Sequence, residues 1–106
     1  DGASARLLVS QNITIAFTIT FAARRADSNG EGGVFEIRGG INKGTTALST
    51  RIIGSLSKTV VSIDNPIWDV TANADNSVGA LKIFVKGVNG IPIRWVAHIE
   101  TVEIRT

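Results

Sequence analysis

One segment alternates between apolar and small residues without exception. Between Asn12 and Ala22, every odd position is Ile or Phe and every even position is Thr or Ala. A period of two is typical of a β-strand, because successive side chains point to opposite faces of a sheet. After the polar, Gly-rich loop 26–33, Phe35, Ile37 and Ile41 share one face again. The pattern therefore predicts a β-hairpin.

The rest of the chain repeats this pattern in shorter runs. Two β-rich runs, 47–53 and 57–63, are separated by Gly54-Ser55 and predict a further pair of strands. Apolar residues then alternate with polar ones over 68–75 and 81–86, and the Asn-Gly dipeptide at 89–90 favours a tight type I′ hairpin. The last strand is expected from Ile91 to Ile104.

Turn signals separate nearly all of these runs. Seven or eight strands at this spacing predict an all-β fold, an antiparallel β-sandwich that is jelly-roll-like, with little or no helix. The length of 106 residues fits a single domain over 1–106. The chain begins at Asp1 and contains no Met, so we expect a fragment of a longer protein.

Three features indicate contact with further copies of the chain. The even-numbered face of the first long strand carries no charge, and Phe84 lies between two lysines on a face expected to meet solvent. In the last strand the apolar face changes sides, which predicts a bulge or a strand that passes onto a neighbouring molecule. The alternative is that Thr-rich faces are ordinary β-formers. The expected interface of this homo-oligomer comprises Thr14, Thr18, Thr20, Phe84, Val102 and Ile104.

Composition excludes several kinds of partner. The net charge is only +2 and the basic residues are scattered, whereas a nucleic-acid interface needs clustered cations. The longest uncharged stretch, 7–23, is too short and too polar to span a membrane, so we expect a soluble protein. Cys is absent, which excludes disulfides and thiolate metal sites.

Catalytic patterns were not found. His98 is the only histidine, with Glu100 and Arg94 on its strand face, and the chain has neither a nucleophile elbow nor a zinc-protease motif. Carboxylates in or beside loops could form a glycosidase pair, but such acids are common in any sandwich. We therefore expect no enzyme and no cofactor. These carboxylates are Asp27, Glu31, Asp64, Asp69 and Asp75.

A calcium loop is the one metal pattern present. Asp27, Asn29 and Glu31 occupy its first, third and fifth positions, before Gly32. The twelfth position should be a bidentate Glu and is Arg38 instead. We expect a polar hairpin loop that holds no metal.

The two tryptophans are candidates for a carbohydrate platform, since indole rings stack on sugars. An exposed Trp68 beside Asp64 and Asn65 would form such a site. However, Trp68 and Trp95 are both in phase with aliphatic neighbours, which predicts that they are buried in the core.

The order of several motifs from about Phe17 onward is familiar. The most specific part runs from Arg94-Trp95-Val96-Ala97 to Thr101-Val102-Glu103. The others are Ala23-Arg24-Arg25-Ala26-Asp27, Phe35-Glu36-Ile37-Arg38-Gly39-Gly40-Ile41, Gly44-Thr45-Thr46-Ala47-Leu48, Trp68-Asp69-Val70 and Gly79-Ala80-Leu81-Lys82-Ile83. With these motifs the chain resembles the C-terminal β-domain of bacteriophage tail-fibre and other virion structural proteins.

The resemblance implies a non-enzymatic module, usually trimeric, that is exposed on the virion, outside the host cell, and contacts host surface glycans. It supplies no list of binding residues. A monomeric carbohydrate-binding module and a capsid-decorating domain are the alternatives.

Overall fold

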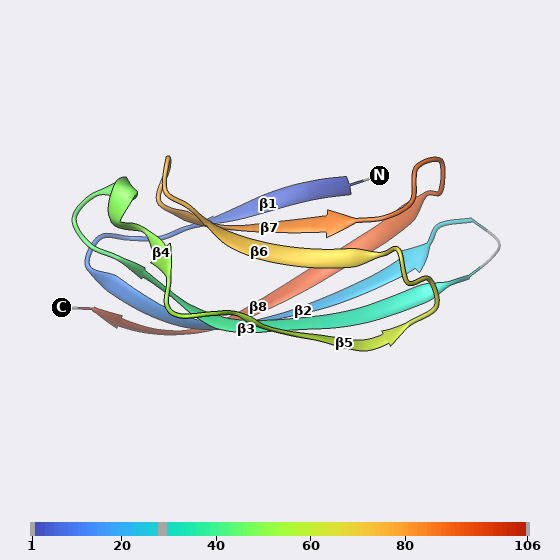
Figure 1. The fold of residues 1–106 in the computed structure, drawn as a ribbon, viewed down its shortest axis with the longest axis horizontal. Coiled ribbons are helices and arrows are strands. Elements are labelled where there is room, and N and C mark those ends of the chain that lie inside the picture. The colour runs from blue at the N-terminus through green and yellow to red at the C-terminus, as the bar shows by residue number, and fades with distance from the viewer. Residues whose placement is uncertain (1, 28–29, 106) are drawn as a thin grey trace.

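The computed structural model of the chain describes residues 2–27 and 30–105. In this part of the chain, eight strands form two antiparallel sheets that pack as a sandwich (Figure 1). This confirms the predicted all-β fold. The strands are β1 (Gly2–Leu8), β2 (Ile13–Arg25), β3 (Gly32–Lys43), β4 (Arg51–Ile52), β5 (Ser57–Ile63), β6 (Asp69–Asp75), β7 (Ala80–Lys86) and β8 (Ile93–Arg105).

The chain crosses between the two sheets three times. The three-stranded sheet has the order β1-β7-β6, and the five-stranded sheet has the order β4-β3-β2-β8, with β5 also paired to β3. Figure 1 shows these sheets as two layers. The strand order places β1 and β8 at sheet edges, and the candidate site lies along these edges.

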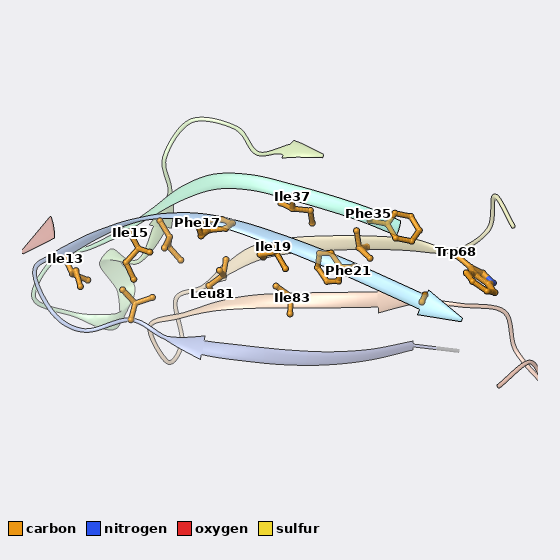
Figure 2. Packing of buried hydrophobic residues seen from close by; sticks show 14 residues of the cluster. Ile13, Ile15, Phe17, Ile19, Phe21, Phe35, Ile37, Trp68, Leu81 and Ile83 are labelled. Atoms are coloured by element: carbon orange, nitrogen blue, oxygen red, sulfur yellow. The ribbon is translucent and has the colours of Figure 1, made fainter. Parts of the chain in front are cut away.

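The core lies between the layers and is centred on β2. Its odd-numbered side chains from Ile13 to Ala23 are buried, as the alternation predicts. Figure 2 shows that Phe17 and Ile19 point from β2 towards Leu81 and Ile83 of β7. Burying each large aliphatic or aromatic side chain contributes about 1.5–3 kcal/mol, so this row supplies much of the stability of the domain.

The predicted strand at 57–63 is confirmed as β5, but the prediction that it pairs with a strand over 47–53 is wrong. Ala47–Ser49 forms a 3₁₀ helix (η1), and the two-residue β4 and the longer β5 each pair with β3 instead of with each other. The Ser49 hydroxyl donates to the Thr46 carbonyl (2.5 Å) and accepts from the Gly44 N–H (2.9 Å). These bonds hold the segment as a turn. No helix in the described part of the chain is long and apolar enough to cross a membrane.

The predicted type I′ hairpin at Asn89-Gly90 is also wrong, because β7 and β8 lie in different sheets. A type I′ turn needs positive φ at both central residues. Here Gly90 has φ +84°, and Asn12 is the one non-glycine residue with positive φ among those described. The Ile91 N–H donates to the Val88 carbonyl (3.1 Å), so the segment is a turn within a connection between layers.

Candidate interaction surface at the edge strand β8

The last strand, β8, pairs with β2 along its whole length. The register runs from Ile13 opposite Arg105 to Arg25 opposite Ile93 without a shift. The predicted bulge in this strand is therefore wrong. The other edge of β8 has no partner strand in residues 2–27 and 30–105. Its N–H and C=O groups on that side are free to bind another chain.

The C-terminal half of β8 is exposed on both faces. On the outer face Val96, Val102 and Ile104 are 68%, 76% and 70% exposed. On the inner face Thr101 and Glu103 are exposed too, because the three-stranded sheet does not cover this part of β8. The sequence suggested that the buried face of this strand switches sides, and the structure shows no such switch. Instead, neither face is buried, whereas a sandwich strand normally buries one.

The two long sides of the sandwich differ in what lies between the layers. On the β5–β6 side, Lys58 Nζ lies 2.7 Å from Asp69 Oδ1 and joins the layers. On the β1–β8 side there is a mostly apolar crevice of about 240 Å³. Its lining consists of Ser4, Ala5, Phe21, Ile83, Val85, Trp95 and Ala97.

Trp95 lies at the inner end of this crevice. Its ring centroid is 6.1 Å from that of Phe35 and 6.3 Å from that of Trp68, so it packs on the core. It is nevertheless only half-buried, because its other side lines the crevice. Trp95 therefore packs on the core as predicted, but it is only partly buried.

The uncharged face of β2 is only one strand wide. Thr18 lies between Arg38 of β3 and Glu100 of β8, and Thr20 lies between Glu36 and His98. The neighbouring strands therefore place charged side chains on both sides of Thr18 and Thr20, so the surface around these two residues is charged. At the other end of the strand the surface is uncharged across three strands. This uncharged patch consists of Thr14, Ala16, Gly40, Val102 and Ile104.

The structure does not bring Phe84 together with the other predicted interface residues. Phe84 lies on the outer face of the three-stranded sheet, opposite Ser4 and Thr71, whereas Val102 and Ile104 lie on the outer face of the five-stranded sheet. Its ring is 37% exposed, and Lys82 Nζ is 4.7 Å from the ring centroid. A single flat interface cannot contain both surfaces.

The predicted carbohydrate platform at Trp68 has no exposed ring. Trp68 is 2% exposed, as its phase in the sequence predicts, and its Nε1 has no hydrogen-bond partner. The Asp64 carboxylate accepts from the Gly32 N–H (2.8 Å), and the Asn65 side chain accepts from the Ile67 N–H (3.0 Å). Both side chains therefore hold the loop between β5 and β6.

The acidic loop between β2 and β3 is organised by an arginine. Arg25 Nη2 lies 2.6 Å from Asp27 Oδ2, and Arg25 Nη1 lies 2.8 Å from Glu31 Oε1. These hydrogen bonds raise the pKa of Arg25. Asn29, the third residue of the calcium pattern, lies outside the described residues. In the part that the structure describes, no three His, Asp or Glu side chains gather as a metal site.

The only histidine lies on an open surface. His98 Nε2 is 3.9 Å from Glu100 Oε1, and both side chains are more than two-thirds exposed on the outer face of β8. This confirms the predicted spacing of the two residues on one strand face.

The chain matches no protein-family model, no curated protein and no solved structure. The function of the domain is therefore inferred from the geometry of β8 and from the sequence motifs. Sequence analysis missed the free edge and the crevice, because both depend on the order of strands in space.

Proposed function

We propose that this domain is a non-enzymatic structural module that assembles with further copies of itself through β8. The observation that carries the proposal is a thirteen-residue edge strand whose C-terminal half is exposed on both faces. Monomeric proteins protect such edges with bulges, prolines, charged side chains or a covering segment. β8 has neither a bulge nor a proline, and its charged residues leave Val96, Val102 and Ile104 exposed between them.

The resemblance to bacteriophage tail-fibre domains supports a place for this module in a virion. There it joins subunits at the fibre tip, outside the cell, and presents them to the host surface. Three copies are the number that the resemblance implies. The uncharged patch beside β8 supports self-association independently, because it is an apolar surface without charge across three strands.

Light scattering coupled to size exclusion tests the proposal. The parent is expected to run at a multiple of its 11.2 kDa mass. Val102→Asp combined with Ile104→Asp should convert it to the monomer, since charge replaces exposed apolar groups. The control is Val61→Asp on β5, where Val61 is also exposed. A parent that stays monomeric at high concentration would show that the proposal is wrong.

A carbohydrate-binding module is the second candidate. Because Trp68 is buried, the aromatic ring that could stack on a sugar is that of Phe84. A hollow of about 410 Å³ beside this ring is lined by charged and amide side chains, which suit sugar hydroxyls. They are Arg6, Asn73, Asp75, Asn76 and Lys82. A glycan array with the parent and Phe84→Ala tests it: the parent should bind a bacterial polysaccharide and the variant should not, at unchanged mass. The absence of binding by the parent would remove this candidate.

A further inference from the structure

We propose that β8 pairs antiparallel with β8 of a second copy, about a two-fold axis that passes through Ile99. The two five-stranded sheets then form one continuous sheet across both molecules. This inference rests on the proposed function and specifies its partner, contact strand and register. It changes the expected number of copies from three to two.

The free edge of β8 has the length and straight register that such pairing needs. It is thirteen residues long, or about 43 Å at 3.3 Å per residue, and its pairing to β2 is unbroken. A second strand therefore finds an uninterrupted row of backbone donors and acceptors. In a two-fold antiparallel pair both outer faces stay on the same side of the joined sheet. Both three-stranded sheets then lie together on the other side.

A centre at Ile99 is the one register that uses the whole strand, because Ile93 then lies opposite Arg105 of the second copy. On the outer face this register places Val96 opposite Val102, His98 opposite Glu100 and Arg94 opposite Ile104, and the symmetry repeats each pair. The two valines of the strand, both exposed in the single chain, thus cover each other. Each histidine ring lies opposite a carboxylate that can accept a hydrogen bond from a ring N–H.

The neighbouring registers lose these matches. A centre at 98 places His98 against its own copy, and a centre at 100 places two Glu100 carboxylates together, which is unfavourable. A centre at 97 shortens the pairing to 93–101 and leaves Val102 and Ile104 unpaired. A centre at 101 sets Glu100 against Val102. A centre at 97 also places Arg94 opposite Glu100, but it leaves 102–105 without a partner. Pairing of the whole strand, together with the match of Val96 with Val102, therefore favours Ile99.

Cysteine cross-linking tests the register, because the chain has no other thiol. A mixture of Val96→Cys and Val102→Cys chains should form a disulfide-linked dimer under mild oxidation. Each variant alone should not, because two copies of the same position lie six residues apart along the strand, about 20 Å. The two single variants are matched controls, since both positions are exposed on the same face. Cross-linking of either variant alone, or none in the mixture, overturns the register.

Exchanging the side chains at positions 98 and 100 is a second test of the register. His98→Glu places two carboxylates opposite each other at two sites and should weaken the dimer at least tenfold in sedimentation equilibrium. Combining His98→Glu with Glu100→Lys should restore most of the affinity. If the double variant is as weak as His98→Glu, the opposed pair does not exist.

The two proposals fail in different ways. A trimeric mass, or a dimer without the mixed cross-link, overturns the β8 register and leaves self-association standing. A monomeric parent overturns both.

Discussion

The two tryptophans show how burial depends on what lies opposite a residue. Trp68 lies immediately before β6 and in phase with its inward residues, and Trp95 lies at an inward position of β8. Yet Trp68 is 2% exposed and Trp95 is only half-buried. Trp68 is covered almost completely by its neighbours. Trp95 rests on Phe35 with one face and lines the open crevice with the other. The sequence determines the direction of a side chain and leaves open whether another layer covers it.

Trp68→Ala should therefore destabilise the domain more than Trp95→Ala. Truncating a buried Trp costs on the order of 3–5 kcal/mol, whereas Trp95 loses fewer contacts and should cost less. His98→Ala removes an exposed side chain and should cost less than about 1 kcal/mol. Urea unfolding in the monomeric Val102→Asp, Ile104→Asp background measures all three. A larger effect at Trp95 than at Trp68 would contradict this order.

Two glycines with positive φ allow a second comparison. Gly79 has φ +73° and Gly54 has φ +63°, so alanine is strained at both. A Cβ at Gly79 would lie 2.7 Å from Lys43 Nζ, which donates to the Val9 carbonyl, whereas a Cβ at Gly54 meets nothing within 4 Å. Gly79→Ala should cost more than Gly54→Ala, which should cost about 1 kcal/mol. Chemical denaturation compares them, and equal losses would mean that Lys43 moves freely.

At the scale of elements, β1 is held by an ion pair as well as by its pairing with β7. Arg6 Nε lies 2.8 Å from Asp75 Oδ2, at the end of β6. The Ser77 hydroxyl donates to the same carboxylate (2.6 Å). Hydrogen bonds from Ser77 and Arg6 lower the pKa of Asp75 from 3.8 to about 2. Folding therefore favours the ionised carboxylate.

Stability should fall with this carboxylate as the solution becomes acidic. Its contribution is present above the unfolded pKa of 3.8 and is lost as the pH falls through about 2. Asp75→Asn should melt lower than the parent at pH 7, and the difference should shrink below pH 4. Ser77→Ala removes the largest cause of the shift and should give an intermediate result. Thermal melts from pH 2 to 7 measure this, and a difference independent of pH would contradict it.

Alternation and turn signals predicted β2, β3, β6 and β7, and the expected strands 57–63 and 91–104 correspond to β5 and β8. The odd-numbered Ile and Phe residues of β2 identify it at once, and β3, β6 and β7 follow the same rule. β1 was missed because its positions are small or mixed, as in Ala5 and Arg6, and its pairing with β7 decides its structure. Segment 47–53 was wrong because the Ser49 side chain bonds to the local backbone, which competes with a strand.

The candidate site was predicted in part. Val102 and Ile104 stand out in the sequence as apolar residues on the wrong face, and the structure confirms their exposure. The Thr18 and Thr20 face could not be judged, since its charges come from β3 and β8. The place of Phe84 on the other layer and the free edge of β8 depend on strand order, which periodicity does not give.

At the scale of the whole molecule, the Lys58–Asp69 ion pair joins the layers along one long side of the sandwich, whereas the other side is open at the apolar crevice between β1 and β8. A second copy along the open side would cover surface that the fold leaves bare. Association of folded chains stabilises the folded state by mass action.

The melting temperature should therefore rise with protein concentration. Calorimetry over a wide concentration range measures the effect, with the Val102→Asp, Ile104→Asp double variant as the control. The control should melt at one temperature throughout. A parent whose melting temperature is independent of concentration would argue against assembly in this range.

The position of β2 has a consequence for how the chain acquires its fold. One of its neighbours, β3, follows it directly, whereas the other, β8, is remote in sequence, with Ile13 paired to Arg105. Such non-local pairing is slow to form, on the order of milliseconds to seconds. Until β8 pairs with it, β2 has an unpaired edge next to its row of Ile and Phe side chains. The refolding yield should therefore decline steeply as chains are concentrated, because unpaired β2 edges of different molecules compete with β8.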